Sequence, residues 1–224
     1  MTALTVATLS AREVARRRTA LLLVSTLPLW FYLVRRDLPG QSVRLLTLGI
    51  AWAISTLTLF VVNGSRSVDP RLRLGGASVV GVIGGRLLAM TGAGVTLALA
   101  YFAVAYADQD LRRPWVTCLM MVLTATLAAP VGALVAALLP RELEGALALL
   151  SISAVEMLAD PAGTVARFLP FWSARELGTY VIDNAGADYL WRALAHAAAV
   201  WLICTGLTYL LFARRLRIHR YPEP

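Results

Sequence analysis

Long apolar runs alternate with short, arginine-rich polar segments along the whole chain. A membrane-spanning helix needs about 20 consecutive apolar residues. The runs that approach this length cover residues 19–34, 43–62, 87–107, 115–139, 143–159 and 189–213. The pattern predicts an all-α membrane protein whose single domain, residues 1–224, has six transmembrane helices between residues 19 and 213 and a cytoplasmic tail over 214–224.

The segment before the first run predicts a helix that lies at the inner membrane interface. Ser10 and Glu13 have the spacing of a capping box, in which both side chains satisfy free backbone N–H groups at a helix start. Arginines stand beside Val6, Leu9 and Val14, as expected for an amphipathic helix. We expect residues 1–18 to form this interfacial helix.

The segment between the second and third runs is polar, and its centre has the composition of a short helix. The apolar stretch that follows, residues 77–107, would measure about 45 Å as one helix, against about 30 Å for the membrane core. Arg86 interrupts this stretch. The pattern therefore predicts that the third span begins near Arg86.

Residues 160–188 are too polar to span a membrane but carry an apolar face at helical spacing. Ser173 and Glu176 form a second capping-box pattern after the sequence FLPFW at 168–172. A re-entrant helix–turn–helix fits this pattern, because its backbone hydrogen bonds stay internal. A pair of surface helices resting on lipid headgroups is the alternative.

Composition and charge agree with a membrane protein and indicate its orientation. Hydrophobic residues make up 58% of the chain and charged residues only 15%. Cytoplasmic loops of membrane proteins carry an excess of basic residues. With both termini in the cytoplasm, thirteen of the 21 basic residues lie inside: Arg12, Arg16, Arg17, Arg18, Arg66, Arg71, Arg73, Arg86, Arg141, Arg214, Arg215, Arg217 and Arg220. We expect this orientation in the inner (plasma) membrane.

The residue inventory excludes several kinds of chemistry. The chain has no lysine, so it has neither a P-loop lysine for ATP nor a lysine for pyridoxal phosphate. Two histidines and two separated cysteines do not provide a zinc or multi-histidine metal site. The arginines flank apolar runs, so we interpret them as determinants of topology and expect no nucleic-acid partner.

Five pieces of sequence occur in an order that resembles one known family. They are a basic helix leading into the first span, RSVDPRLRLGGAS at 66–78, GRLLA at 85–89, FLPFW at 168–172 and FARRL at 212–216. This order resembles the permease subunits of type 2 exporters among ATP-binding-cassette (ABC) transporters, over nearly the whole chain.

The resemblance implies a transport function without catalytic residues in this chain. The loop between spans two and three would be a coupling helix docking on a separate ATPase through Arg66, Val68, Asp69, Arg71, Leu72 and Arg73. That ATPase would bind ATP and magnesium, and a second permease, identical or homologous, would complete the complex. The substrate would be a hydrophobic or amphipathic molecule. A plainer interpretation of the loop is that its arginines bind anionic lipid headgroups.

Candidate pathway residues are polar or aromatic side chains in or beside the apolar runs. Glu156 lies inside the fifth run, where an ionisable group tends to face the bundle interior or a watery cavity. Solvation at the membrane interface is its alternative. The other candidates are Ser55, Thr56, Phe171 and Trp172, although serine and threonine also serve ordinary helix packing.

Two enzymatic alternatives arise from single motifs. Asp108 and Asp110 have the D-x-D form of metal-dependent glycosyl transferases, which suggests a membrane-embedded glycosyl or lipid transferase. An intramembrane serine hydrolase would need a base beside its nucleophile, and His196 is the only candidate inside a run. No Gly-x-Ser-x-Gly motif accompanies that histidine.

Overall fold

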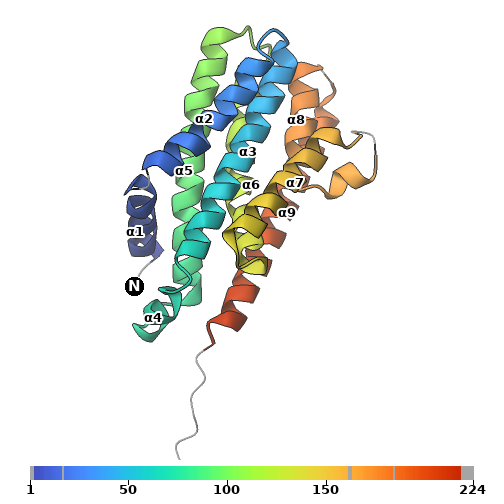
Figure 1. Ribbon diagram of the computed structural model, residues 1–224. Helices are drawn as coiled ribbons and strands as arrows, with labels where there is room; N and C mark the ends of the chain where they lie inside the picture. The colour runs from blue at the N-terminus through green and yellow to red at the C-terminus, as the bar shows by residue number, and fades with distance from the viewer. Residues whose placement is uncertain (1–2, 17, 161–162, 184, 218–224) are drawn as a thin grey trace, which may run out of the picture.

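The computed structural model describes residues 3–16, 18–160, 163–183 and 185–217, and the regular structure in these ranges is entirely helical. Figure 1 shows the helices as a bundle whose longest members run side by side. In chain order they are α1 (Ala3–Arg16), α2 (Arg18–Val34), α3 (Pro39–Gly64), α4 (Asp69–Leu74), α5 (Val79–Asp108), α6 (Pro114–Leu138), α7 (Glu142–Leu158), the 3-10 helix η1 (Val165–Phe168), α8 (Trp172–Ile182) and α9 (Ala187–Arg215).

Among the residues that the structure describes, four helices are long and apolar enough to cross a membrane: α3, α5, α6 and α9. This confirms the prediction of a helical membrane protein. The other two predicted spans correspond to α2 and α7, which have 17 residues each. Both fall at the lower limit of length for a crossing helix.

Helix α3 is the centre of the bundle. It packs against α2, α5, α6, α7 and α8, and its inward positions are almost completely buried. Its closest neighbour is α6, where the Ser55 hydroxyl donates a hydrogen bond of 3.0 Å to the carbonyl of Ala128. A Cβ atom at Gly132 would overlap the Ser55 carbonyl oxygen. Small residues therefore let the two backbones approach, as is typical of helix contacts in membranes.

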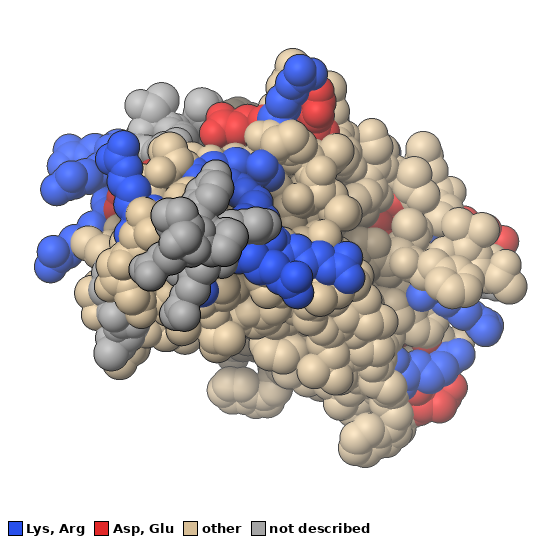
Figure 2. Space-filling view, turned by 90° about the horizontal axis from the view of Figure 1, so that it is seen from below, with Lys and Arg blue, Asp and Glu red and all other residues tan. Residues whose placement is uncertain are grey.

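The two ends of the bundle differ in the connections that they carry. Helix α4, the first residue of α1 and the last turn of α9 lie toward one end, and the α2–α3, α5–α6 and α8–α9 connections lie at the other (Figure 1). The first end carries Arg71 and Arg73 on α4 and Arg214 and Arg215 on α9. Figure 2 looks at this end and shows arginine side chains gathered around it.

The first helix begins earlier than the capping-box pattern predicted. Helix α1 starts at Ala3 and packs along α5, so Ser10 lies inside the helix and is buried rather than serving as an N-cap. Close approach explains this position, because Gly85 of α5 lies directly against the backbone of Ala3 and the side chain of Val6. Packing against α5 therefore decides where Ser10 lies.

Helix α5 is one continuous helix of 30 residues that begins at Val79, so Arg86 lies inside it. The start of the membrane-crossing part of this helix near Arg86 stays a prediction. The N-cap of α5 is Ser78, whose hydroxyl accepts the Gly81 N–H at 2.9 Å. Arg86 does not break the helix, since its guanidinium is buried and forms an ion pair with the equally buried Asp69 of α4. This ion pair attaches α4 to the side of α5.

The Asp69–Arg86 pair gives a stability prediction. Arg86→Gln leaves the Asp69 carboxylate buried without a counter-charge, which costs about 3–5 kcal/mol in comparable buried pairs. We expect a lower midpoint of thermal unfolding for the detergent-purified protein, and recovery of most of the loss in the neutral pair Asp69→Asn with Arg86→Gln. Arg71→Gln, a change at an exposed arginine of α4, is the control. Equal midpoints for Arg86→Gln and Arg71→Gln would show that the pair does not hold α4 in place.

Candidate functional site

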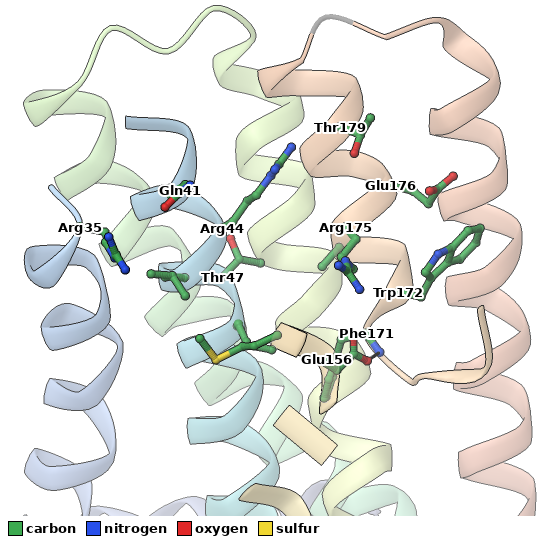
Figure 3. A pocket seen from close by; sticks show the side chains of 14 residues that line it. Arg35, Gln41, Arg44, Thr47, Glu156, Phe171, Trp172, Arg175, Glu176 and Thr179 are labelled. Atoms are coloured by element: carbon green, nitrogen blue, oxygen red, sulfur yellow. Dashed lines mark hydrogen bonds between the residues drawn. The ribbon is translucent and has the colours of Figure 1, made fainter. Parts of the chain in front are cut away.

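A pocket of about 380 Å³ opens between the N-terminal half of α3, the end of α7 and α8. Figure 3 shows Arg44 and Thr47 of α3 on one side of this space and Arg175 and Thr179 of α8 on the other. Helix α8 and the first half of α3, which line the pocket, lie toward the end of the bundle opposite α4 (Figure 1). Its lining consists of Arg35, Gln41, Arg44, Leu45, Thr47, Leu48, Glu156, Met157, Phe171, Trp172, Ala174, Arg175, Glu176 and Thr179.

The floor of the pocket is built where the chain passes from α7 to α8. Glu156, buried near the end of α7, accepts the backbone N–H of Phe171 at 2.7 Å. Arg175 of α8 reaches back and donates to the carbonyl of Ala159 at 2.7 Å. Pro170 has no N–H to donate, which suits a connection that leaves the helical path. Two polar contacts thus fix the position of α8 relative to α7.

Helix α8 begins at Trp172 without a side-chain cap, so the second capping-box prediction was wrong. The Ser173 side chain is buried, and its hydroxyl forms no hydrogen bond within the described residues. Glu176 faces Arg192 of α9 instead of the helix start, with 3.2 Å between its Oε2 and the Arg192 Nε. The contact with Arg192 of α9 therefore determines the orientation of Glu176.

Contacts with α9 fix the other face of α8. The Trp172 ring meets the His196 ring edge-on, with 5.1 Å between the ring centres. The His196 Nε2 lies 3.2 Å from the Arg167 carbonyl oxygen, so this histidine joins α9 to η1. Burial raises the pKa of the Glu176 carboxyl, and the neighbouring Arg192 guanidinium acts in the opposite direction. His196 thus contacts α8 and η1, and within the described residues its ring forms no hydrogen bond with a hydroxyl or thiol group.

Helix α3 contributes the opposite wall of the pocket. Arg44 crosses to α8 and pairs with Asp183, with 2.6 Å between Nη2 and Oδ2. Gly178 makes this crossing possible, because a Cβ atom there would lie 3.2 Å from the Arg44 Nε. Close to the pocket, Gly40 of α3 is in direct contact with Ile182 of α8. These contacts keep the pocket walls in a defined arrangement.

The structure brings three of the five predicted pathway residues together. Glu156, Phe171 and Trp172 all line the pocket. Ser55 is completely buried in the contact between α3 and α6, and Thr56 beside it is 2% exposed. The burial of Ser55 and Thr56 fits the alternative interpretation, in which these side chains serve ordinary helix packing.

The residues predicted to dock an ATPase divide into inward and outward groups. Asp69 is buried in its pair with Arg86, and Leu72 packs against the hydrophobic core. Arg66 donates to the side chain of Asn63 and to the carbonyl of Ala136, and Arg73 to the carbonyl of Ala77 at 2.5 Å. Val68 and Arg71 are exposed, together with Leu74, which the sequence did not single out.

The D-x-D motif lies at the end of α5, where its first carboxylate is already bound. Asp108 forms an ion pair with Arg36 and accepts a hydrogen bond from the Tyr32 hydroxyl. Within the described ranges, no three histidine, cysteine or acidic side chains form a group that could hold a metal ion. Asp108 therefore acts as a structural link between α2 and α5.

Sequence reasoning missed the arginine and amide side chains of the pocket. Gln41 and Arg44 stand at the start of an apolar run, and Arg175 lies in the polar segment 160–188; basic residues at such positions usually mark the membrane surface. The neighbouring sequence does not distinguish an arginine that points into a pocket from one that faces solvent. The partners of Arg44 and Arg175 come from other helices, so only the tertiary fold reveals their position.

The Glu156 contact gives a second prediction. Glu156→Leu leaves the Phe171 N–H buried without an acceptor, which costs about 1–3 kcal/mol. Glu156→Gln keeps an oxygen that accepts this N–H, so we expect nearly unchanged stability. Thermal unfolding and the rate of protease cleavage between residues 159 and 171 measure the effect, with the exposed Glu142→Leu as control. If Glu156→Leu unfolds and is cleaved like the unmodified protein, the contact does not hold α8.

Comparison with known proteins leaves the family of this chain open. No protein-family model matches the chain, and a search of curated proteins finds no match. Its function must therefore be inferred from its own geometry.

Proposed function

We propose that this chain is the permease subunit of an ABC exporter, in which a separate ATPase subunit hydrolyses ATP. The observation that carries the proposal is α4, a short helix held at the arginine-rich end of the bundle by a buried ion pair, with an exposed outer side. A plain connection between helices needs no buried ion pair. A coupling helix that transmits movement from an ATPase must be firmly attached to α5, and a buried ion pair provides such an attachment.

The exposed side of α4 has the character of a docking surface. Val68 is 46% exposed and Leu74 is 78% exposed, and the exposed Arg71 lies between them in sequence. Apolar side chains flanked by arginine suit an acidic, partly apolar groove on a partner protein. The neighbouring Arg66 and Arg73 are bound to backbone carbonyls and stabilise the ends of this segment.

We propose six membrane crossings, with α2 and α7 added to the four longer helices. A helix of 17 residues measures about 26 Å, which reaches across a membrane core with slight local thinning. With six crossings, α4 and the end of α9 lie on the same side of the membrane. The arginines at that end support a location in the cytoplasm of a cell with an inner (plasma) membrane.

Helix α5 then extends beyond the membrane. Its 30 residues correspond to about 45 Å, so its first turns project toward the cytoplasm. The Asp69–Arg86 pair lies two turns from the start of α5, near the inner interface. The proposed coupling helix, α4, is therefore attached to α5, which continues to the opposite end of the bundle.

Energy for transport must come from a partner, because the chain has no lysine for a phosphate-binding loop. We propose that ATP and magnesium are bound by an ABC ATPase and that a second permease subunit, identical or homologous, pairs with this one. ATP-driven rocking of the two halves would alternate access to the pathway. The pocket between α3, α7 and α8 is the outer part of that pathway, with Glu156, Phe171 and Trp172 in its lining.

The transferase alternative is less well supported by the geometry. A metal-dependent transferase needs free carboxylates facing a substrate, whereas Asp108 is bound by Arg36 and Tyr32. The pocket lies between α3, α7 and α8, and Asp108 is not among its lining residues.

Recovery of the complex from native membranes tests the docking proposal. The tagged, unmodified chain should co-purify with an ABC ATPase identified by mass spectrometry, and the complex should hydrolyse ATP. Val68→Glu with Leu74→Glu places two carboxylates in the interface and should reduce the recovered ATPase at least about tenfold, which corresponds to 1.4 kcal/mol.

The control for this experiment is Leu38→Glu, which changes a leucine of similar exposure in the α2–α3 connection at the other end of the bundle. It should leave ATPase recovery unchanged. Failure of the unmodified chain to recover any ABC ATPase would contradict the proposed function. Equal recovery by the double variant and the control would show that α4 is not the docking element.

A further inference from the structure

The pocket contains guanidinium groups whose hydrogen-bonding capacity is not used within the described part of the chain. The Arg175 Nη1 and the Arg44 Nε are buried and have no acceptor there. Arg35, at the mouth of the pocket, is exposed and its side chain forms no hydrogen bond or ion pair with a described residue. Buried donors without acceptors are costly, so groups of this kind are normally satisfied by protein, water or ligand.

The carboxylates that line the pocket each face a donor, although the Glu176 Oε2 forms no hydrogen bond within the described residues. Glu156 accepts the Phe171 N–H, and Glu176 faces the Arg192 guanidinium. Asp183, next to the pocket, holds Arg44 through one of its terminal nitrogens. The unused capacity of the pocket is therefore mainly that of a donor and a cation. An anion is the ligand that satisfies it.

The rest of the lining is apolar. Leu45 and Leu48 of α3 contribute to one wall, Met157 of α7 to another, and Phe171 and Trp172 lie at the start of α8 (Figure 3). The guanidinium groups and this apolar surface share one cavity of about 380 Å³. Small-molecule sites have volumes of about 300–1,000 Å³, and this cavity is near the lower end of that range. It therefore suits one small ligand rather than a two-chain lipid.

We propose that this pocket binds a single-chain amphiphile with a compact anionic head, such as a phosphate, sulfate or carboxylate. Arg175, whose Nη1 is buried without an acceptor among the described residues, binds the head, because arginine pairs well with the oxygens of such groups. Arg35 lies on the opposite side of the pocket in Figure 3 and attracts the anion toward the pocket mouth. The chain of the ligand lies against Leu48, Met157 and Trp172. This inference rests on the proposed function, for which it names the substrate class.

Equilibrium binding of radiolabelled dodecyl phosphate tests the proposal. The full chain is placed in nanodiscs of phosphatidylcholine, and binding to empty nanodiscs is subtracted. We expect saturable binding that unlabelled dodecyl phosphate displaces and that neither inorganic phosphate nor dodecyltrimethylammonium displaces at the same concentration. Displacement by the cationic amphiphile, or absence of saturable binding, would overturn the proposal.

Two pocket variants and one matched control locate the site. Arg175→Gln should weaken binding about tenfold or more, as expected for a charge-assisted hydrogen bond. Arg35→Gln should weaken it without changing the melting temperature, because Arg35 has no side-chain partner in the described structure. Arg167→Gln removes an exposed arginine of η1 outside the pocket lining and should bind normally. Equal affinity of all three variants and the unmodified protein would place the ligand elsewhere.

A further arm distinguishes a free amphiphile from a membrane lipid. Nanodiscs that contain phosphatidylglycerol should bind the probe as well as those of phosphatidylcholine alone. Loss of probe binding in them would assign the pocket to an anionic bilayer lipid and overturn the single-chain assignment. The binding assay contains no ATPase, so it is independent of the co-purification experiment. Loss of probe binding together with normal ATPase recovery in that experiment refutes only the ligand class. Normal probe binding without any ATPase recovery refutes only the proposed function.

Discussion

The buried ion pair between Asp69 and Arg86 is the interaction on which the arrangement of the arginine-rich end depends. Charges removed from water are stable only when paired, so Arg86 in the side of α5 requires an acid, and Asp69 at the start of α4 supplies it. The pair holds α4 against α5 and leaves Val68, Arg71 and Leu74 on the outside. A polar connection is thereby attached to a long helix, as the proposed transport mechanism requires.

The opposite end of the bundle uses the same principle with smaller contacts. Glu156 and Arg175 each bind one backbone group, and together they hold α8 beside α7. Arg44 and Asp183 join α8 to α3, which packs against most of the bundle. A shift of α3 or α7 must therefore change the pocket. This mechanical connection supports the proposal that movement at the cytoplasmic end opens or closes the outer pathway.

The sequence predicted the helical class, the polar connection that contains α4 and the grouping of Phe171 and Trp172 with Glu156. Hydrophobic periodicity and the cost of a buried acid were sufficient for the first two and for the burial of Glu156, because both are local properties. Phe171 and Trp172 were named only through the resemblance to ABC permeases. The capping boxes at Ser10 and Ser173 were wrong because packing against α5 and α9 places these serines in buried positions. The roles of Arg86 and Arg44 depend on partners 17 and 139 residues away, which no local pattern encodes.

The central claim is that six crossings place α4 in the cytoplasm and the pocket outside, and cysteine accessibility tests it most directly. In a chain with Cys118 and Cys204 replaced by alanine, single cysteines are placed at the exposed positions Arg12, Asp37, Ser67, Asp110 and Ala187. An impermeant maleimide should label positions 37, 110 and 187 in intact cells and positions 12 and 67 only after permeabilisation. Labelling of position 67 in intact cells, or protection of position 187, would contradict the account.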